Sequence, residues 1–394
     1  MGGRERFHRA ELLSHTLQLP FCPVPKPLWA VIAILGSLPF RLTIWIWERN
    51  LTSFRPRLAL VQGAKAERYS LVRVSVCFHD RCFDGACAAA FFTRLYLARV
   101  DSRAEIHYLG LVHRAGQLFD EAMFDGDENA IVDFKYCSSE RLTWWFDHHQ
   151  SAFLTESDAE HFRRDSSGRK FYDPSFRSCT KLIASIGATR FGFEARDLDD
   201  LVHWADVIDG AQYPDARTAV EMKDPAMQIT LAIEGTRSSG FVAGLIPDLI
   251  ARPLSEVAAL PRVRDAFDHL YNQHLKWADI IRGRAELQDG VLFFDVADQA
   301  LEGFNKFIPY YLFPEAVYSV GLSRSSERIK IAVGSSPWNP TPKLVNLASI
   351  CERYGGGGHA KVAAISLLPT DLEGARAVAR DIVHELRANI QSLR

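Results

Sequence analysis

The residues of this chain best suited to chemistry are Asp147, His148 and His149, a carboxylate followed by two imidazoles. They come directly after the apolar run 143–146, which is too short for a core helix and contains aromatic residues that favour strands. Sites in open α/β sheets form where strands end. Adjacent side chains point in different directions, so one imidazole could bind a metal while the other faces a substrate. A run this short also occurs in ordinary loops.

A second set of candidate ligands follows another predicted strand. The apolar run 73–78 leads into His79, Cys82 and Asp84, and residues 86–99 then have the composition of a helix. His79 and Asp84 combine a borderline-soft nitrogen with a hard oxygen, a mixture that suits Mn²⁺, Zn²⁺ or Fe²⁺ better than Ca²⁺. The competing interpretation of Asp84 is a helix cap.

Further carboxylates end two other predicted elements. Asp133 lies at the end of a short apolar strand, and Asp206 and Asp209 lie near the end of a helix predicted at 198–208. Taken singly, a turn or a solvated helix face would explain each of them. Several apolar elements that each end in His or Asp are costly unless cations neutralise the carboxylates. The set as a whole therefore predicts a dinuclear metal site.

In this order the blocks resemble the DHH phosphoesterase superfamily with its C-terminal DHH-associated domain. The resemblance covers roughly residues 72–390 and is far more specific than any single motif. It implies an α/β fold with a parallel-sheet N-terminal domain, a smaller mixed-sheet α/β C-terminal domain, and a cleft between them. The blocks are His79-x-x-Cys82-x-Asp84-Gly85, Asp133-Phe134-x-Tyr136, Asp147-His148-His149, Asp206 and Gly355-Gly356-Gly357-Gly358-His359.

The resemblance also implies two bound divalent ions, usually Mn²⁺, with Mg²⁺, Co²⁺ or Zn²⁺ as other candidates. By position, His79 and Asp133 resemble the ligands of one ion. Asp133 would bridge to the second ion, whose ligands by resemblance are Asp84, Asp133, His148 and Asp206.

The same resemblance assigns catalytic roles to Asp147 and His149. Asp147 would orient the loop or a ligand, and His149 would face the scissile phosphate. Cys82 departs from the family, most of which carries Asp at this position. As a thiolate, Cys82 would be a ligand that favours softer metals, and as a thiol it would leave the position to water.

The C-terminal half contains candidate substrate-binding groups. Arg324 follows a predicted strand at 316–322 and resembles the family's phosphate-binding arginine, whereas on sequence alone a surface hairpin is slightly favoured. Consecutive glycines expose backbone N–H groups to an anion, and a following histidine adds a donor. An apolar strand predicted at 362–368 disfavours a flexible linker here. The predicted substrate-binding residues are Arg324, Gly356, Gly357, Gly358 and His359.

Length and composition fit two domains in one chain. With 394 residues, the chain is long enough for two hydrophobic cores. We expect an extension at 1–70, a catalytic DHH domain at 71–215, a helical connector at 216–285 and a substrate-binding domain at 286–394. The net charge of -2 argues against strong duplex binding. Seven cysteines without a Cys-x-x-Cys pair fit a reducing compartment and favour the cytoplasm.

Residues 1–70 lie outside the resemblance. The interpretations, in order of preference, are a disordered or misassigned upstream extension, a peripheral helix, and a membrane anchor through 28–47. That segment has about the ~20 residues that a span needs, but Pro39 and Arg41 interrupt it. The sequence leaves the oligomeric state open.

We therefore expect an exonuclease-like, metal-dependent phosphohydrolase that cleaves a phosphodiester in short oligonucleotides or small nucleotides. The reaction would be attack by a hydroxide that bridges the two ions. An alternative enzyme is an exopolyphosphatase acting on phosphoanhydrides. A different class of protein, a non-catalytic nucleic-acid-binding scaffold of the same superfamily, is favoured only by Cys82.

Overall fold

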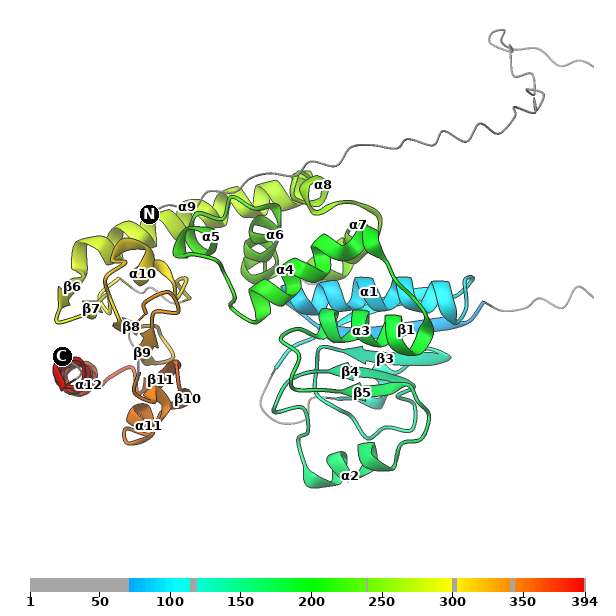
Figure 1. Ribbon diagram of the computed structural model, residues 1–394, viewed down its shortest axis with the longest axis horizontal. Helices are drawn as coiled ribbons and strands as arrows, with labels where there is room; N and C mark the ends of the chain where they lie inside the picture. The colour runs from blue at the N-terminus through cyan, green and yellow to red at the C-terminus, as the bar shows by residue number, and fades with distance from the viewer. Residues whose placement is uncertain (1–70, 114–118, 239, 300–302, 341–343, 393–394) are drawn as a thin grey trace, which may run out of the picture. The chain divides into compact units, whose positions relative to one another are not determined.

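The computed structural model describes residues 71–113, 119–238, 240–299, 303–340 and 344–392 (Figure 1). The first described part contains a five-stranded sheet in which every neighbouring pair is parallel, with the strand order β2-β1-β3-β4-β5. Its strands are β1 (Arg73–His79), β2 (Glu105–Leu111), β3 (Glu128–Val132), β4 (Trp144–Asp147) and β5 (Lys170–Tyr172).

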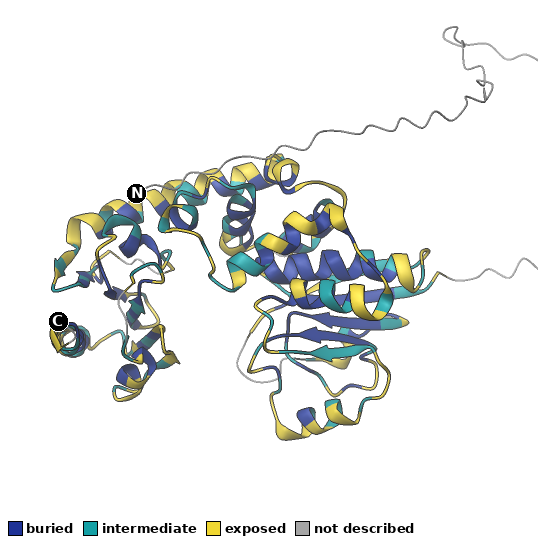
Figure 2. Ribbon diagram, viewed as in Figure 1, coloured by how far each residue is buried: buried dark blue, intermediate teal, exposed yellow. Residues whose placement is uncertain are grey.

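Both faces of the central strands are buried, which explains why they read as continuous apolar runs. Val74, Val76 and Phe78 of β1 pack in one core, while Cys77 packs with Ile131 in another. The first core is covered by the helices α1 (Phe83–Arg99), α3 (Cys179–Phe191) and α4 (Asp199–Asp209). Figure 2 shows that most of α1 is buried. The second core includes Phe162 of α2 (Glu156–Arg164).

Five helices join this sheet to the second one. They are α5 (Ala216–Glu221), α6 (Pro225–Gly235), α7 (Phe241–Ala251), α8 (Leu254–Ala258) and α9 (Pro261–Arg284). Pro225 and Pro261 occupy the first turn of their helices, where a missing N–H costs nothing. α7 packs on α1, and α6 packs on α8 and α9. Two short 3₁₀ turns also occur, at Glu121–Met123 and Arg196–Leu198.

The second sheet has six strands in the order β10-β11-β9-β8-β7-β6, and only the β7–β8 pair is parallel. Its strands are β6 (Glu286–Gln288), β7 (Val291–Asp295), β8 (Tyr318–Arg324), β9 (Ile329–Ser335), β10 (Gly357–His359) and β11 (Val362–Leu367). The associated helices are α10 (Ile308–Leu312), α11 (Leu347–Glu352) and α12 (Leu372–Ser392).

The two faces of this sheet differ in side-chain size. Val320 and Leu322 of β8, with Ile331 of β9, pack into the core that α12 completes. The intervening positions on the opposite face carry small residues, such as Gly321, which pairs with Ala332. This contrast leaves room against one face of the sheet.

The predicted fold class, a parallel-sheet α/β part with a smaller mixed-sheet α/β part, is confirmed. The domain boundaries remain a prediction. No helix within the described ranges is long and apolar enough to cross a membrane. Residues 1–70, including the segment 28–47, lie outside the described residues.

Candidate metal centre

The candidate site lies at the carboxyl ends of three neighbouring parallel strands. His79 is the last residue of β1, Asp133 follows β3, and Asp147 ends β4. The register pairs Phe78 with Val132 and Val132 with Phe146, so the three ends lie level. Residues distant in sequence therefore meet because parallel strands end at the same edge.

One group of potential ligands consists of His79, Asp133 and His149, whose ligand atoms lie within 4.8 Å of one another. His79 Nδ1 is 3.3 Å from Asp133 Oδ2. His149 Nδ1 is 2.7 Å from Asp147 Oδ1, so the buried Asp147 fixes the orientation of that imidazole. Asp133 has a φ of 57°, a left-handed conformation that is uncommon outside glycine and that aims its carboxylate between the two groups.

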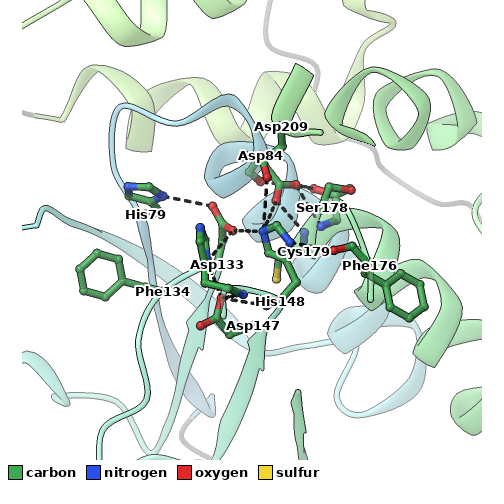
Figure 3. A network of polar contacts seen from close by, with 12 residues as sticks. His79, Asp84, Asp133, Phe134, Asp147, His148, Phe176, Ser178, Cys179 and Asp209 are labelled. Carbon is green, nitrogen blue, oxygen red and sulfur yellow. Dashed lines mark hydrogen bonds and ion pairs between the residues drawn. The ribbon is translucent and has the colours of Figure 1, made fainter. Parts of the chain in front are cut away.

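The second group consists of Asp84, His148 and Asp209 (Figure 3). His148 Nε2 lies 3.4 Å from Asp209 Oδ2, 3.4 Å from Asp133 Oδ1 and 3.7 Å from Asp84 Oδ2. The Nδ1 atom of His148 is 3.1 Å from the Phe176 carbonyl, to which it can donate, leaving Nε2 facing the carboxylates. Asp133 therefore approaches both groups.

Asp84 is held by the start of α3. The backbone N–H groups of Cys179 and Thr180 donate to its two carboxylate oxygens at 2.6 and 3.0 Å, and the Thr180 hydroxyl donates at 2.6 Å. A helix N-terminus favours negative charge, so the main chain compensates for part of the cost of burying this carboxylate.

The site contains more carboxylates than the single positive charge of a protonated His148 can neutralise. Burial and the charges of Asp133 and Asp209 hold the pKa of Asp84 well above its usual range. Burial and Asp133 raise the pKa of Asp209 to about 6. Burial opposes protonation of His148, but the nearby carboxylates of Asp133, Asp84 and Asp209 raise the pKa of His148 to about 10. Bound cations would relieve this repulsion without protons.

The donor set fits divalent cations. Asp133 Oδ1 and His148 Nε2 are buried and have no hydrogen-bond partner, although buried polar atoms normally have one. Imidazole nitrogens and carboxylate oxygens are ligands for first-row divalent metals. Each of the two groups could therefore hold one ion.

Asp206, the residue that the resemblance selects from α4, does not join either group. The Ser178 hydroxyl donates to Asp206 Oδ1 at 3.3 Å, and Asp209, three residues further on, supplies the carboxylate next to His148. Positions three apart lie on neighbouring faces of a helix, so the sequence alone could not decide between them. The acidic residue at the end of the helix is the one that reaches the strand ends.

Cys82 is the N-cap residue of α1, and its side chain makes no cap hydrogen bond. It belongs to neither ligand group. Burial and the charges of Asp133, Asp209 and Asp84 hold the pKa of its thiol well above the usual range, which favours the neutral form. His113, which the sequence analysis missed, stacks on Phe134 at a centroid distance of 4.6 Å and meets His79 edge-on at 4.9 Å.

The predicted substrate-binding residues do not gather at one point of the second sheet. Alternation along β8 puts Arg324 on the face of Val320 and Leu322, next to α12. His359 pairs with Val362, whose partner is Gly334, so His359 lies on the opposite, small-residue face.

The glycine run has a packing role as well. A Cβ on Gly356 would lie 2.4 Å from the Ala364 carbonyl, and one on Gly358, which has a φ of 146°, would lie 2.5 Å from the Val362 carbonyl. Gly357 has open space beside it. Close strand pairing therefore explains two of the predicted glycines, and Gly357 remains free to approach an anion.

No protein-family model and no curated protein matches this sequence. Among solved structures, a pGpG-specific phosphodiesterase, PggH, from Vibrio cholerae matches with a TM-score of 0.57 and 19% identity, covering 80% of this chain and 99% of that one. An exopolyphosphatase-related protein from Bacteroides fragilis matches with a TM-score of 0.50 and 11% identity, covering 81% and 94%. The chain therefore has the same fold as these two proteins.

Proposed function

We propose that this chain is a divalent-metal-dependent phosphohydrolase that cleaves a phosphodiester in short oligonucleotides or small nucleotides. One ion would be held by His79, Asp133 and His149. The other would be held by Asp84, His148, Asp209 and the shared Asp133. Mn²⁺ is the ion we expect, because mixed imidazole and carboxylate sites suit it.

The observation that carries the proposal is the pair of buried atoms Asp133 Oδ1 and His148 Nε2, which lie 3.4 Å apart as an ion pair but have no hydrogen bond. A decayed site in a binding scaffold would have no reason to keep several buried ionisable groups at the end of a well-packed sheet. The proposal of an enzyme is therefore better supported than that of a non-catalytic scaffold.

Divalent ions bound here would supply activation of water and neutralisation of phosphate charge, the main needs of phosphoryl transfer. The protein groups would fix the geometry. Asp147 holds the His149 ring, the Phe176 carbonyl holds the His148 ring, and the start of α3 holds Asp84. Partners of this kind set ligand orientation and basicity.

The substrate class rests on the fold matches and on charge. PggH is specific for pGpG, a short nucleotide, and a net charge of -2 does not suit non-specific binding to long nucleic acids. The exopolyphosphatase-related match keeps phosphoanhydride hydrolysis as the second candidate.

The test uses the full chain, treated with chelator and then supplied with Mn²⁺, Mg²⁺, Co²⁺ or Zn²⁺ separately. Each sample is assayed with pGpG, longer oligonucleotides and polyphosphate, and metal content is measured on the same protein. We expect about two ions per chain and metal-dependent release of mononucleotides. Hydrolysis that survives complete metal removal, or no hydrolysis with any ion, would contradict the proposal.

A further inference from the structure

A cavity of ≈ 200 Å³ lies against the small-residue face of the second sheet. Its floor is formed by paired positions of β8 and β9, where Ser319 lies opposite Gly334 and Gly321 lies opposite Ala332. A Cβ on Gly321 would lie 2.3 Å from the Phe294 ring. One on Gly334 would lie 2.8 Å from the Tyr310 hydroxyl, so the two glycines let these aromatic side chains pack on the sheet beside the cavity.

The walls of the cavity are aromatic. Phe304 is half-buried and meets the buried Phe294 edge-on at a centroid distance of 5.6 Å. Phe307 is held from outside the cavity by Tyr213 at 5.3 Å and by Trp338 at 5.4 Å. These ring contacts fix the orientation of the aromatic side chains, so a ligand that packs on them would cost little side-chain conformational entropy.

The rim is positively charged. Lys306 and Lys361 are exposed residues that line the cavity, in a chain whose net charge is -2. An ammonium group only donates hydrogen bonds, so the rim suits acceptor groups such as phosphate oxygens or the ring oxygens and nitrogens of a base.

Residues that line the cavity are neighbours of the candidate metal ligand Asp209 in the sequence and of His359 in the second sheet. Gly210, which lines it, directly follows the candidate ligand Asp209. On the other side it is lined by Val362, an apolar residue that is 40% exposed and pairs with His359. Arg324, on the opposite face of the sheet, is not part of it.

We propose that this cavity binds one planar nucleobase of the substrate, with the adjoining phosphates at the lysine rim. The inference rests on the proposed function and assigns its substrate class to nucleotides. The volume is below the ~300 Å³ of the smallest drug-sized pockets, so it suits a single ring system and not a whole dinucleotide. Polyphosphate has no flat apolar part that would use the aromatic walls.

The experiment compares two substrates with the same backbone, pGpG and its abasic analogue in which both bases are replaced by hydrogen. Base stacking on an aromatic side chain changes affinity by roughly 5- to 150-fold, so wild-type kcat/KM should favour pGpG by about tenfold or more. Phe304→Ala should bring this ratio close to one. Ala332→Leu, which fills the floor, should do the same.

The control is Phe241→Ala, because Phe241 is another half-buried phenylalanine, on α7, that packs against the first core and not the cavity. It should leave the ratio of the two substrates unchanged even if it lowers stability. Since the ratio is measured on one protein sample, loss of folded protein or of metal cancels out.

Equilibrium binding of guanosine monophosphate gives a readout that does not need turnover. We expect Phe304→Ala to weaken it by about tenfold. If the wild type hydrolyses both substrates equally and binds the mononucleotide no better than Phe304→Ala does, the base pocket is wrong and the phosphohydrolase stands. If the mononucleotide binds in a Phe304-dependent way but no phosphodiester is cleaved, the pocket stands and the proposed function fails.

Discussion

The two sheets of this protein use their side chains in opposite ways. The parallel sheet concentrates charge, because its level strand ends bring Asp133, Asp147 and three histidines close to Asp84 of α1 and Asp209 of α4. The mixed sheet creates volume, because one of its faces is built from glycine, serine and alanine. Metal-dependent hydrolysis would need the clustered charge, and recognition of the substrate would need the cavity.

The two sheets also differ in whether the buried polar groups at their candidate sites are hydrogen-bonded. At the strand ends of the parallel sheet, Asp133 Oδ1 and His148 Nε2 have no hydrogen bond. In the mixed sheet, the buried Ser319 hydroxyl is bonded to Tyr310 at 2.8 Å. Cations would compensate the charges at the strand ends of the first sheet, whereas the Ser319–Tyr310 pair is already hydrogen-bonded.

The largest effect that would test this contrast is expected from Asp133→Asn. Asn tolerates the left-handed φ of 57° and keeps the side-chain volume, so the fold should survive while the shared charge is lost. We expect hydrolysis to fall by more than about a hundredfold, since even partners of metal ligands cost 10–100-fold when they are removed. Metal content and circular dichroism should be measured together.

The matched control for that experiment is Asp125→Asn, an exposed carboxylate near the other end of β1 that pairs with Arg73. Its activity should stay close to wild type. Appreciable turnover by Asp133→Asn at full Mn²⁺ occupancy would show that Asp133 is not the bridging ligand.

A second prediction separates the two acids of α4. Asp209→Asn should weaken Mn²⁺ binding by about 10–100-fold, whereas Asp206→Asn should change it by less than about threefold. The reason is that Asp209 Oδ2 faces His148, while Asp206 accepts from Ser178. Calorimetric titration of both variants measures this directly, and the reverse ranking would restore Asp206 as the ligand.

The sequence predicts the central strands and most of the residues in the two candidate ligand groups. Runs such as 74–78 and 144–146 are largely apolar because both faces of a parallel sheet are buried, and the polar residues that end them stand out. β2 lies at the sheet edge and has a mixed pattern of exposure, so it was not recognised, nor was His113 beyond its end. The cavity could not be predicted either, because it depends on strand register across β8 and β9.

A third prediction tests whether Cys82 lies close enough to the ions to matter. Cys82→Asp restores the residue that most of the superfamily carries and supplies an acceptor at the N-cap of α1. We expect Mn²⁺ to bind roughly tenfold more tightly, because affinity follows the charge of the ligand set. We also expect lower thermal stability in chelator, since the new carboxylate joins three others. Cys82→Ser is the control, and an unchanged titration for Cys82→Asp would place the position away from the ions.

The smallest effect concerns the two buried histidines, which differ because of their surroundings. Acids raise the pKa of His148, whereas burial lowers the pKa of His274 on α9, even though its Nε2 donates to the Val220 carbonyl at 2.9 Å. His274 is therefore neutral in the folded protein, while in the unfolded chain it takes up its proton near the ordinary histidine pKa of about 6.5. The contribution of neutral His274 to the free energy of unfolding is complete above that pH and is lost as the pH falls below it.

His274→Gln keeps a donor for Val220 and cannot titrate. The free energy of unfolding of the wild type should therefore fall more steeply than that of the variant between about pH 6.5 and 5. Denaturant titrations at fixed metal concentration measure the difference, and parallel pH curves would mean that His274 is protonated in the folded protein.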